Sequence, residues 1–131
     1  MQKIIVGFDG SDPSKEALKL GKEHARAFAA AVYILSSMEA GPDKPFKEVK
    51  TTEEALEKIK QQFESEGIGC ETHVLITGLT PGEDLVQHSN EIQADEIIVG
   101  VTKRSKLDKL IFGSTVQYVI LNASCPVVTV K

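Results

Sequence analysis

Five short apolar runs alternate with segments of helical periodicity along this chain, and this alternation limits the folds that are open to it. Each run has the length of a strand rather than that of a helix. The runs span residues 2–8, 31–37, 70–77, 95–100 and 126–130. Strands that alternate with helices are joined by right-handed crossovers in a parallel sheet. We therefore predict an α/β fold, an open five-stranded parallel sheet with helices on both faces.

Cap residues predict where two of the helices begin. Ser11 or Asp12 can cap a first helix that runs from about residue 13 to residue 30, with a proline at its first position. Thr80 and Glu83 have the spacing of a capping box and predict the start of the third helix. Apolar residues at helical spacing place the second helix, which ends near residue 67, and the last one (Leu56, Ile59 and Phe63; Val116, Val119, Ile120 and Ala123).

The composition predicts the class of protein. The 131 residues suit a single domain over residues 1–131, and the net charge of −4 argues against nucleic acid binding. Cys70 and Cys125 have the spacing of neither a zinc site nor a disulfide framework, so we expect free thiols in a reducing compartment. No apolar run is long enough for a membrane span or a signal peptide. We expect a cytoplasmic protein without a membrane partner.

The order of the strands decides where a ligand would bind. In open parallel sheets, ligands bind beyond the carboxyl ends of the strands where the strand order reverses. Two orders are open, the flavodoxin-like 2-1-3-4-5 and the order 3-2-1-4-5. The unusual residues follow the first strand, at 9–11, and the fourth strand, at 100–114. Because the order 3-2-1-4-5 places these two strands side by side, we favour it.

The segment IIVGVTKRSKLDKLIFGST, residues 97–115, has the features of a phosphate site. Gly113 and Ser114 open the last helix, whose free N–H groups and positive dipole end favour an anion. The loop before them carries four basic residues and one acid (Lys103, Arg104, Lys106 and Lys109; Asp108). Asp9, at the end of the first strand, can accept from a ribose hydroxyl or from a base amino group. Together these residues suit a nucleotide.

A simpler interpretation remains open for the loop. Charged loops are usually only solvated, and a Gly-Ser pair before a helix is often only a cap. On the loop alone this interpretation is favoured. The position of Asp9 at the same predicted crevice shifts the balance towards a ligand.

This sequence lacks the motifs of several enzyme classes. There is no Gly-x4-Gly-Lys-[Ser/Thr] segment and no G-x-G-x-x-G after the first strand. The three histidines have no partners in a nucleophile motif and no metal-ligand spacing. The basic loop offers only Asp108 as a general base. We expect no strong catalytic activity and at most slow hydrolysis of a bound nucleotide.

Three segments resemble the universal stress protein family. That family has the pattern Gly-x2-Gly-x9-Gly-[Ser/Thr] after the fourth strand, and this chain has Gly100-x2-Lys103-x9-Gly113-Ser114. The opening IIVGFDGSDPS and the ending NASCPVVTVK are similar to the family's first and last strands. The resemblance covers the whole chain.

The resemblance implies a fold, a ligand and an assembly. The fold is adenine nucleotide alpha hydrolase-like, with strand order 3-2-1-4-5. One branch of the family binds ATP and another does not. The family also forms dimers through the last strand, here Pro126 to Val130, whose unprotected apolar edge would itself tend to pair.

The resemblance also implies a set of nucleotide-binding residues. Asp9 would contact the adenosine, and Ser37 and Val99 would line the base pocket. Ribose and phosphates would lie against the residues around the glycine pattern (Gly100, Lys103, Arg104, Gly113, Ser114 and Thr115).

Lys103 departs from the glycine of the ATP-binding pattern. A left-handed backbone at a lysine costs about 1–2 kcal/mol, and a charge-assisted bond to a phosphate returns roughly 1.5–3 kcal/mol. Because the two values are comparable, Lys103 does not exclude ATP binding. We predict ATP as the ligand, with AMP or ADP as alternatives and Mg²⁺ bound through the phosphates. The predicted function is that of a nucleotide-binding regulator in a stress response. The alternative is a family member that binds no nucleotide and contacts a protein partner through residues 103–109.

Overall fold

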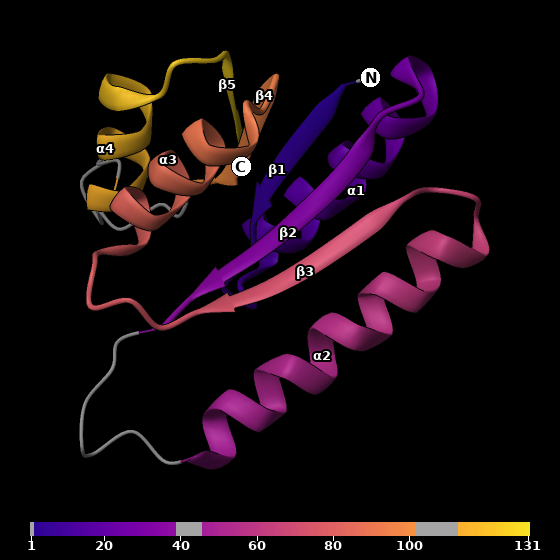
Figure 1. Cartoon of the computed structure of the whole chain (residues 1–131), viewed down its shortest axis with the longest axis horizontal. Coiled ribbons are helices and arrows are strands. Elements are labelled where there is room, and N and C mark those ends of the chain that lie inside the picture. The colour runs from indigo at the N-terminus through magenta and orange to yellow at the C-terminus, as the bar shows by residue number, and fades with distance from the viewer. Residues whose placement is uncertain (1, 39–45, 102–112) are drawn as a thin grey trace.

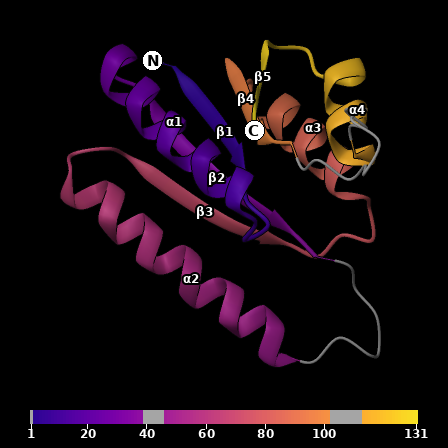
Figure 2. The same cartoon turned by 180° about the vertical axis from the view of Figure 1, so that it is seen from behind.

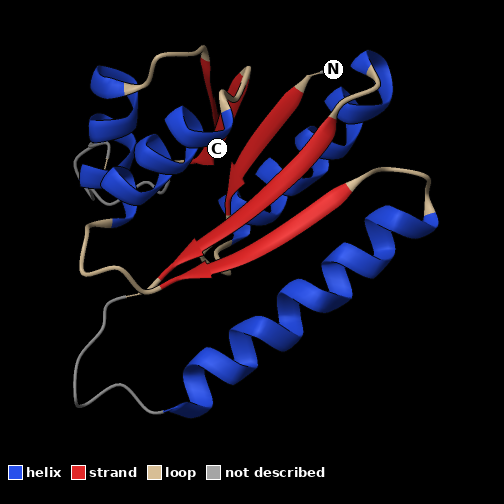
Figure 3. Ribbon diagram, viewed as in Figure 1, coloured by secondary structure: helices blue, strands red, loops and turns tan. Residues whose placement is uncertain are grey.

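The computed structural model describes residues 2–38, 46–101 and 113–131 and contains the predicted alternation of strands and helices (Figure 1). Its strands are β1 Lys3–Gly7, β2 Ala31–Ser37, β3 Cys70–Leu75, β4 Glu96–Gly100 and β5 Val127–Val130. Its helices are α1 Asp12–Phe28, α2 Phe46–Ser65, α3 Pro81–Ile92 and α4 Ser114–Asn122. The described strands form one parallel sheet (Figure 3).

The strand order is β3-β2-β1-β4-β5. This confirms the predicted order 3-2-1-4-5 and excludes the flavodoxin-like order. The chain moves outward from β1 through β2 to β3, then returns to the other side of β1 with β4. The carboxyl ends of β1 and β4 are therefore neighbours, and the residues after them meet at one edge of the sheet.

Helices cover both faces of the sheet, as predicted (Figure 2). On one face, α1 and α2 supply apolar side chains such as Leu18, Leu56 and Phe63. On the other face, α3 and α4 supply Leu85 and Val119, among others. Central strands in such a sheet are buried on both sides, which explains why β1 and β4 are continuous apolar runs rather than alternating ones.

The helix starts follow the predicted caps. Ser11, rather than Asp12, caps α1, and its hydroxyl accepts from the Ser14 N–H at 3.3 Å. Thr80 and Glu83 form the capping box of α3. At its other end, α1 stops at Phe28, two residues earlier than predicted, because Ala29 adopts a left-handed backbone with φ of 53°.

The structure bears on two further sequence expectations. Among the described residues, no helix combines the length and the apolar character that a membrane crossing needs. Cys70 and Cys125 are free thiols, as predicted. Burial raises the pKa of the Cys70 thiol to about 11, so this thiol stays protonated at neutral pH.

Candidate functional site

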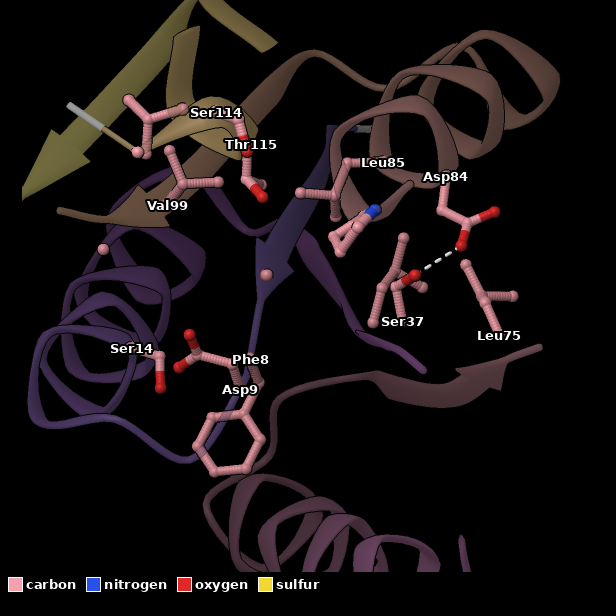
Figure 4. A pocket seen from close by; sticks show the side chains of 16 residues that line it. Phe8, Asp9, Ser14, Ser37, Leu75, Asp84, Leu85, Val99, Ser114 and Thr115 are labelled. Carbon is pink, nitrogen blue, oxygen red and sulfur yellow. Dashed lines mark hydrogen bonds between the residues drawn. The ribbon is translucent and has the colours of Figure 1, made fainter. Parts of the chain in front are cut away.

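A pocket opens at the carboxyl end of the sheet, where β1, β2 and β4 meet the starts of α1, α3 and α4 (Figure 4). Its cavity volume is about 170 Å³, roughly ten times what one water molecule needs. Its lining includes five branched aliphatic side chains (Leu35, Leu75, Leu85, Val99 and Val116). Apolar walls with a few polar groups are typical of small-molecule sites.

Asp9 provides a fixed carboxylate at the end of β1. The Ser11 N–H donates to Asp9 Oδ1 at 2.9 Å. Burial raises the pKa of Asp9, but hydrogen bonds from the Ser11 side chain and backbone and from the Ser14 side chain outweigh it and hold this pKa below its ordinary value. Asp9 is therefore ionised at neutral pH and can accept hydrogen bonds.

The start of α4 lies on another side of the pocket and has the features of an anion site. Gly113 is the N-cap of this helix, and because it has no side chain it cannot accept from the free N–H groups of the first helical turn. Ser114 and Thr115, the first residues of the helix, also line the pocket. A helix N-terminus with open N–H groups and nearby hydroxyls favours a phosphate or a carboxylate.

A buried carboxylate forms a further wall. Asp84, in the first turns of α3, is only 3% exposed. It accepts from the Ser37 hydroxyl at 2.5 Å and from the Thr77 hydroxyl at 2.6 Å. Through these contacts α3 is tied to the end of β2 and to the loop after β3.

The pocket brings together the predicted site residues that fall within the described part of the chain (Asp9, Ser37, Val99, Gly100, Gly113, Ser114 and Thr115). Lys103 and Arg104 lie outside the described residues. The sequence interpretation missed Ser14 and Asp84. The sequence interpretation assigned Glu83 to the capping box and gave Asp84, the next residue, no role. Asp84 could have been found as a site residue because it is an acid in the first turn of a helix that starts near a strand end.

A model of the universal stress protein family matches residues 1–131. The chain belongs to this family. Universal stress protein MJ0531 of Methanocaldococcus jannaschii is 33% identical, and the alignment covers 99% of this chain and 82% of that protein. The resemblance that the sequence motifs indicated is thereby confirmed.

Solved structures of universal stress proteins share the fold. One from Archaeoglobus fulgidus has a TM-score of 0.87 and 33% identity, with 100% of this chain and 99% of that chain covered. A universal stress protein from the same organism in complex with dAMP has a TM-score of 0.81 and 29% identity, with coverage of 100% and 98%. The adenine nucleotide alpha hydrolase-like fold predicted from the resemblance is confirmed.

Proposed function

We propose that this protein binds an adenine nucleotide in the pocket and acts as a nucleotide-dependent regulator in a stress response. The observation that carries this proposal is the pairing of two groups around one apolar pocket. These are the ionised Asp9 carboxylate and the open N-terminus of α4 at Gly113. A relative in complex with dAMP supports the same ligand class.

The chemistry of the walls orients the nucleotide. Phosphates belong at the start of α4, where Ser114 and Thr115 add hydroxyl donors. A ribose hydroxyl can donate to Asp9, which lies at the end of β1 (Figure 4). The base then lies between aliphatic side chains towards the end of β2, near Ser37, and Val99 of β4 borders the pocket between the base and the phosphates (Figure 4).

We propose ATP as the nucleotide, with AMP and ADP as alternatives. The proposed roles of Lys103 and Arg104 rest on their charge alone, which suits several phosphates. Within the described part of the chain, no three side chains of the metal-ligating types cluster. Mg²⁺ would therefore arrive on the phosphates rather than at a protein site.

We propose binding without strong catalysis. Hydrolysis needs a base that activates water near the terminal phosphate. At the start of α4, the described residues offer backbone N–H groups and the hydroxyls of Ser114 and Thr115. These groups stabilise charge but are poor bases. A turnover above about 1 per second, the low end of ordinary enzymes, would overturn this part of the proposal.

A second candidate function is protein binding without a nucleotide. The basic segment 103–109 would then be a docking surface on an acidic chain. Exposed apolar side chains on α4, the helix that follows this segment in the sequence, favour this candidate, since Ile120 is 49% exposed and Leu121 is 81% exposed. Failure to bind ATP together with capture of a protein partner through these residues would support it.

We also propose a homodimer and a cytoplasmic location. β5 lies at the edge of the described sheet, beside β4, and unprotected edges tend to pair with another strand. Two copies would pair through Pro126 to Val130 about a two-fold axis. The free thiols Cys70 and Cys125 fit a reducing compartment.

Native mass spectrometry of freshly purified protein, followed by titration with Mg-ATP after removal of any nucleotide, tests the proposed binding. We expect a bound adenine nucleotide and weaker binding in Asp9→Ala and Ser114→Ala. Lys103→Gly should stay within about tenfold of wild type if backbone strain and charge offset each other. No binding at millimolar ATP would overturn the proposal and favour the protein-binding candidate.

A further inference from the structure

We propose that Asp84 acts through Ser37 to make the base end of the pocket accept hydrogen bonds only, so that the site selects a purine with a 6-amino group over one with a 6-oxo group. This inference rests on the nucleotide binding proposed above and adds a basis for base selection. Asp84 is a positioning residue in this scheme, and Ser37 is the residue that meets the base.

Each oxygen of the Asp84 carboxylate accepts a hydrogen bond from a neighbouring hydroxyl group. Two hydroxyl donors, from Ser37 at 2.5 Å and from Thr77 at 2.6 Å, approach its two oxygens. O–H to O⁻ distances of roughly 2.5–2.7 Å are typical of charge-assisted hydrogen bonds. Asp84 also lies in the first turns of α3, where the helix dipole favours negative charge.

The Ser37 hydroxyl therefore donates its only proton to Asp84. A serine hydroxyl has one proton to donate and two lone pairs that accept. Because the proton points at Asp84, Ser37 presents only lone pairs to the pocket that it lines. The Thr77 proton is committed in the same way, and the Thr77 oxygen accepts from the Leu79 N–H at 3.1 Å. Of the described residues, Ser37 and Thr77 therefore donate no hydroxyl proton to this corner.

The corner suits a base rather than a phosphate. Figure 4 shows Ser37, Asp84 and Leu75 on one side of the pocket, while Ser114 and Thr115 lie on another. A carboxylate and acceptor lone pairs repel a phosphate. The aliphatic side chains of Leu75 and Leu85, which also line the pocket, pack well against a flat ring.

At position 6 of the ring, adenine and hypoxanthine present opposite hydrogen-bonding groups to such a corner. The 6-amino group of adenine donates, and Ser37 can accept from it. The 6-oxo group of hypoxanthine only accepts, so it would face other acceptors without a partner. Sites built around one hydrogen-bonding group reject analogues that lack it far more strongly than apolar pockets do. We expect at least about a tenfold preference for the amino base, which is a modest estimate for such a mismatch.

Isothermal titration calorimetry of the affinities for Mg-ATP and Mg-ITP tests this inference, because the two probes have the same ribose and phosphates and differ only in the base. Wild type should bind Mg-ATP at least about tenfold more tightly. In Asp84→Asn the new amide can donate to Ser37 and free its hydroxyl proton for the pocket. The ratio of the Mg-ATP affinity to the Mg-ITP affinity should then fall towards one, mainly because Mg-ITP binds more tightly than it does to wild type. Ser37→Ala should also lower the ratio, and Gln87→Ala on the exposed side of α3 should leave it unchanged.

Each outcome decides between the two proposals. Wild type that binds both probes equally would overturn the inference and leave nucleotide binding intact. A ratio that survives in Ser37→Ala would also overturn it, and this variant serves if Asp84→Asn fails to fold in a thermal melt. Wild type that binds neither probe would overturn the proposed function and this inference with it.

Discussion

Gly100, the last residue of β4, lies directly against the backbone of Pro13 at the start of α1. A β carbon at Gly100 would be 2.5 Å from the Pro13 carbonyl carbon and 2.7 Å from the Ser14 nitrogen. Non-bonded carbon atoms pack favourably at about 3.5–4.0 Å, so no other side chain fits without movement of the backbone. This contact brings the ends of β1 and β4 and the start of α1 around one pocket.

Gly100→Ala should therefore destabilise the protein and weaken nucleotide binding together. Overpacking against a well-packed neighbour costs about 1–3 kcal/mol, and a rigid backbone neighbour places the expected cost in the upper part of this range. The first turn of α1 must move away, and it holds Ser14 beside Asp9. Urea unfolding would measure the change in the free energy of unfolding, and ATP titration would measure the change in affinity.

Gly69→Ala is the matched control for this substitution. A β carbon at Gly69 would meet the Ala31 side chain at 3.8 Å, which is ordinary van der Waals contact. We expect its free energy of unfolding to stay within about 0.5 kcal/mol of wild type, as for most surface changes. Equal losses in both variants would show that the contact between Gly100 and Pro13 has no special role.

The capping box at Thr80 should stabilise the helix that carries Asp84. The Thr80 hydroxyl accepts from the Glu83 N–H at 3.3 Å, and Glu83 Oε1 accepts from the Thr80 N–H at 3.2 Å. Thr80→Ala should lower the free energy of unfolding by about 1 kcal/mol, the usual loss for an N-cap. Thr80→Ser keeps the hydroxyl and should retain most of the stability. If chemical denaturation gives the two variants the same midpoint, the box does not stabilise α3.

Protonation of His88 should destabilise the folded protein at pH values below the ordinary histidine pKa. Burial, followed by the charge of His73, lowers the pKa of His88, although Glu91 and Glu71 oppose the shift. The two histidine rings lie 5.2 Å apart, and His88 Nε2 is buried with no hydrogen-bond partner among the described residues. The unfolded chain therefore binds a proton more readily than the folded one. The stabilisation is complete above about pH 6.5 and is lost as the pH falls towards the lowered folded pKa.

His88→Leu should accordingly flatten the dependence of stability on pH between about pH 5 and 7. His73→Gln should flatten it in part, because it removes the second cause of the pKa shift. Denaturant unfolding at a series of pH values gives the slopes for comparison with wild type. Identical slopes in wild type and His88→Leu would contradict this assignment.

The sequence predicted the fold well because its decisive signals are local. Apolar runs gave the strands, Pro13 and Thr80 marked helix starts, and unusual residues after two strands selected the strand order. The link between Ser37 and Asp84 could not be predicted in this way. These residues are 47 positions apart, and they meet only because α3 packs across the end of β2.

Strand β5 offers a direct test of the proposed dimer. The Pro126 carbonyl accepts from the Ile97 N–H of β4 at 3.1 Å, and the Val130 carbonyl accepts from the N–H of Val101, just after β4, at 2.6 Å. Backbone groups alternate in direction along a strand, so the N–H groups of Val127 and Thr129 point towards the open edge. An antiparallel partner strand would use these two donors. Proline is tolerated in an edge strand where its missing N–H would face outward.

Thr129→Pro should therefore yield a folded monomer, because it removes an outward donor and leaves the pairing with β4 in place. Val128→Pro is the matched control, since it removes a group that faces β4 and should lower the free energy of unfolding instead. Light scattering at micromolar concentration, with circular dichroism on the same samples, separates the two effects. A monomeric wild type would contradict the dimer, and a dimeric, folded Thr129→Pro would place the interface away from β5.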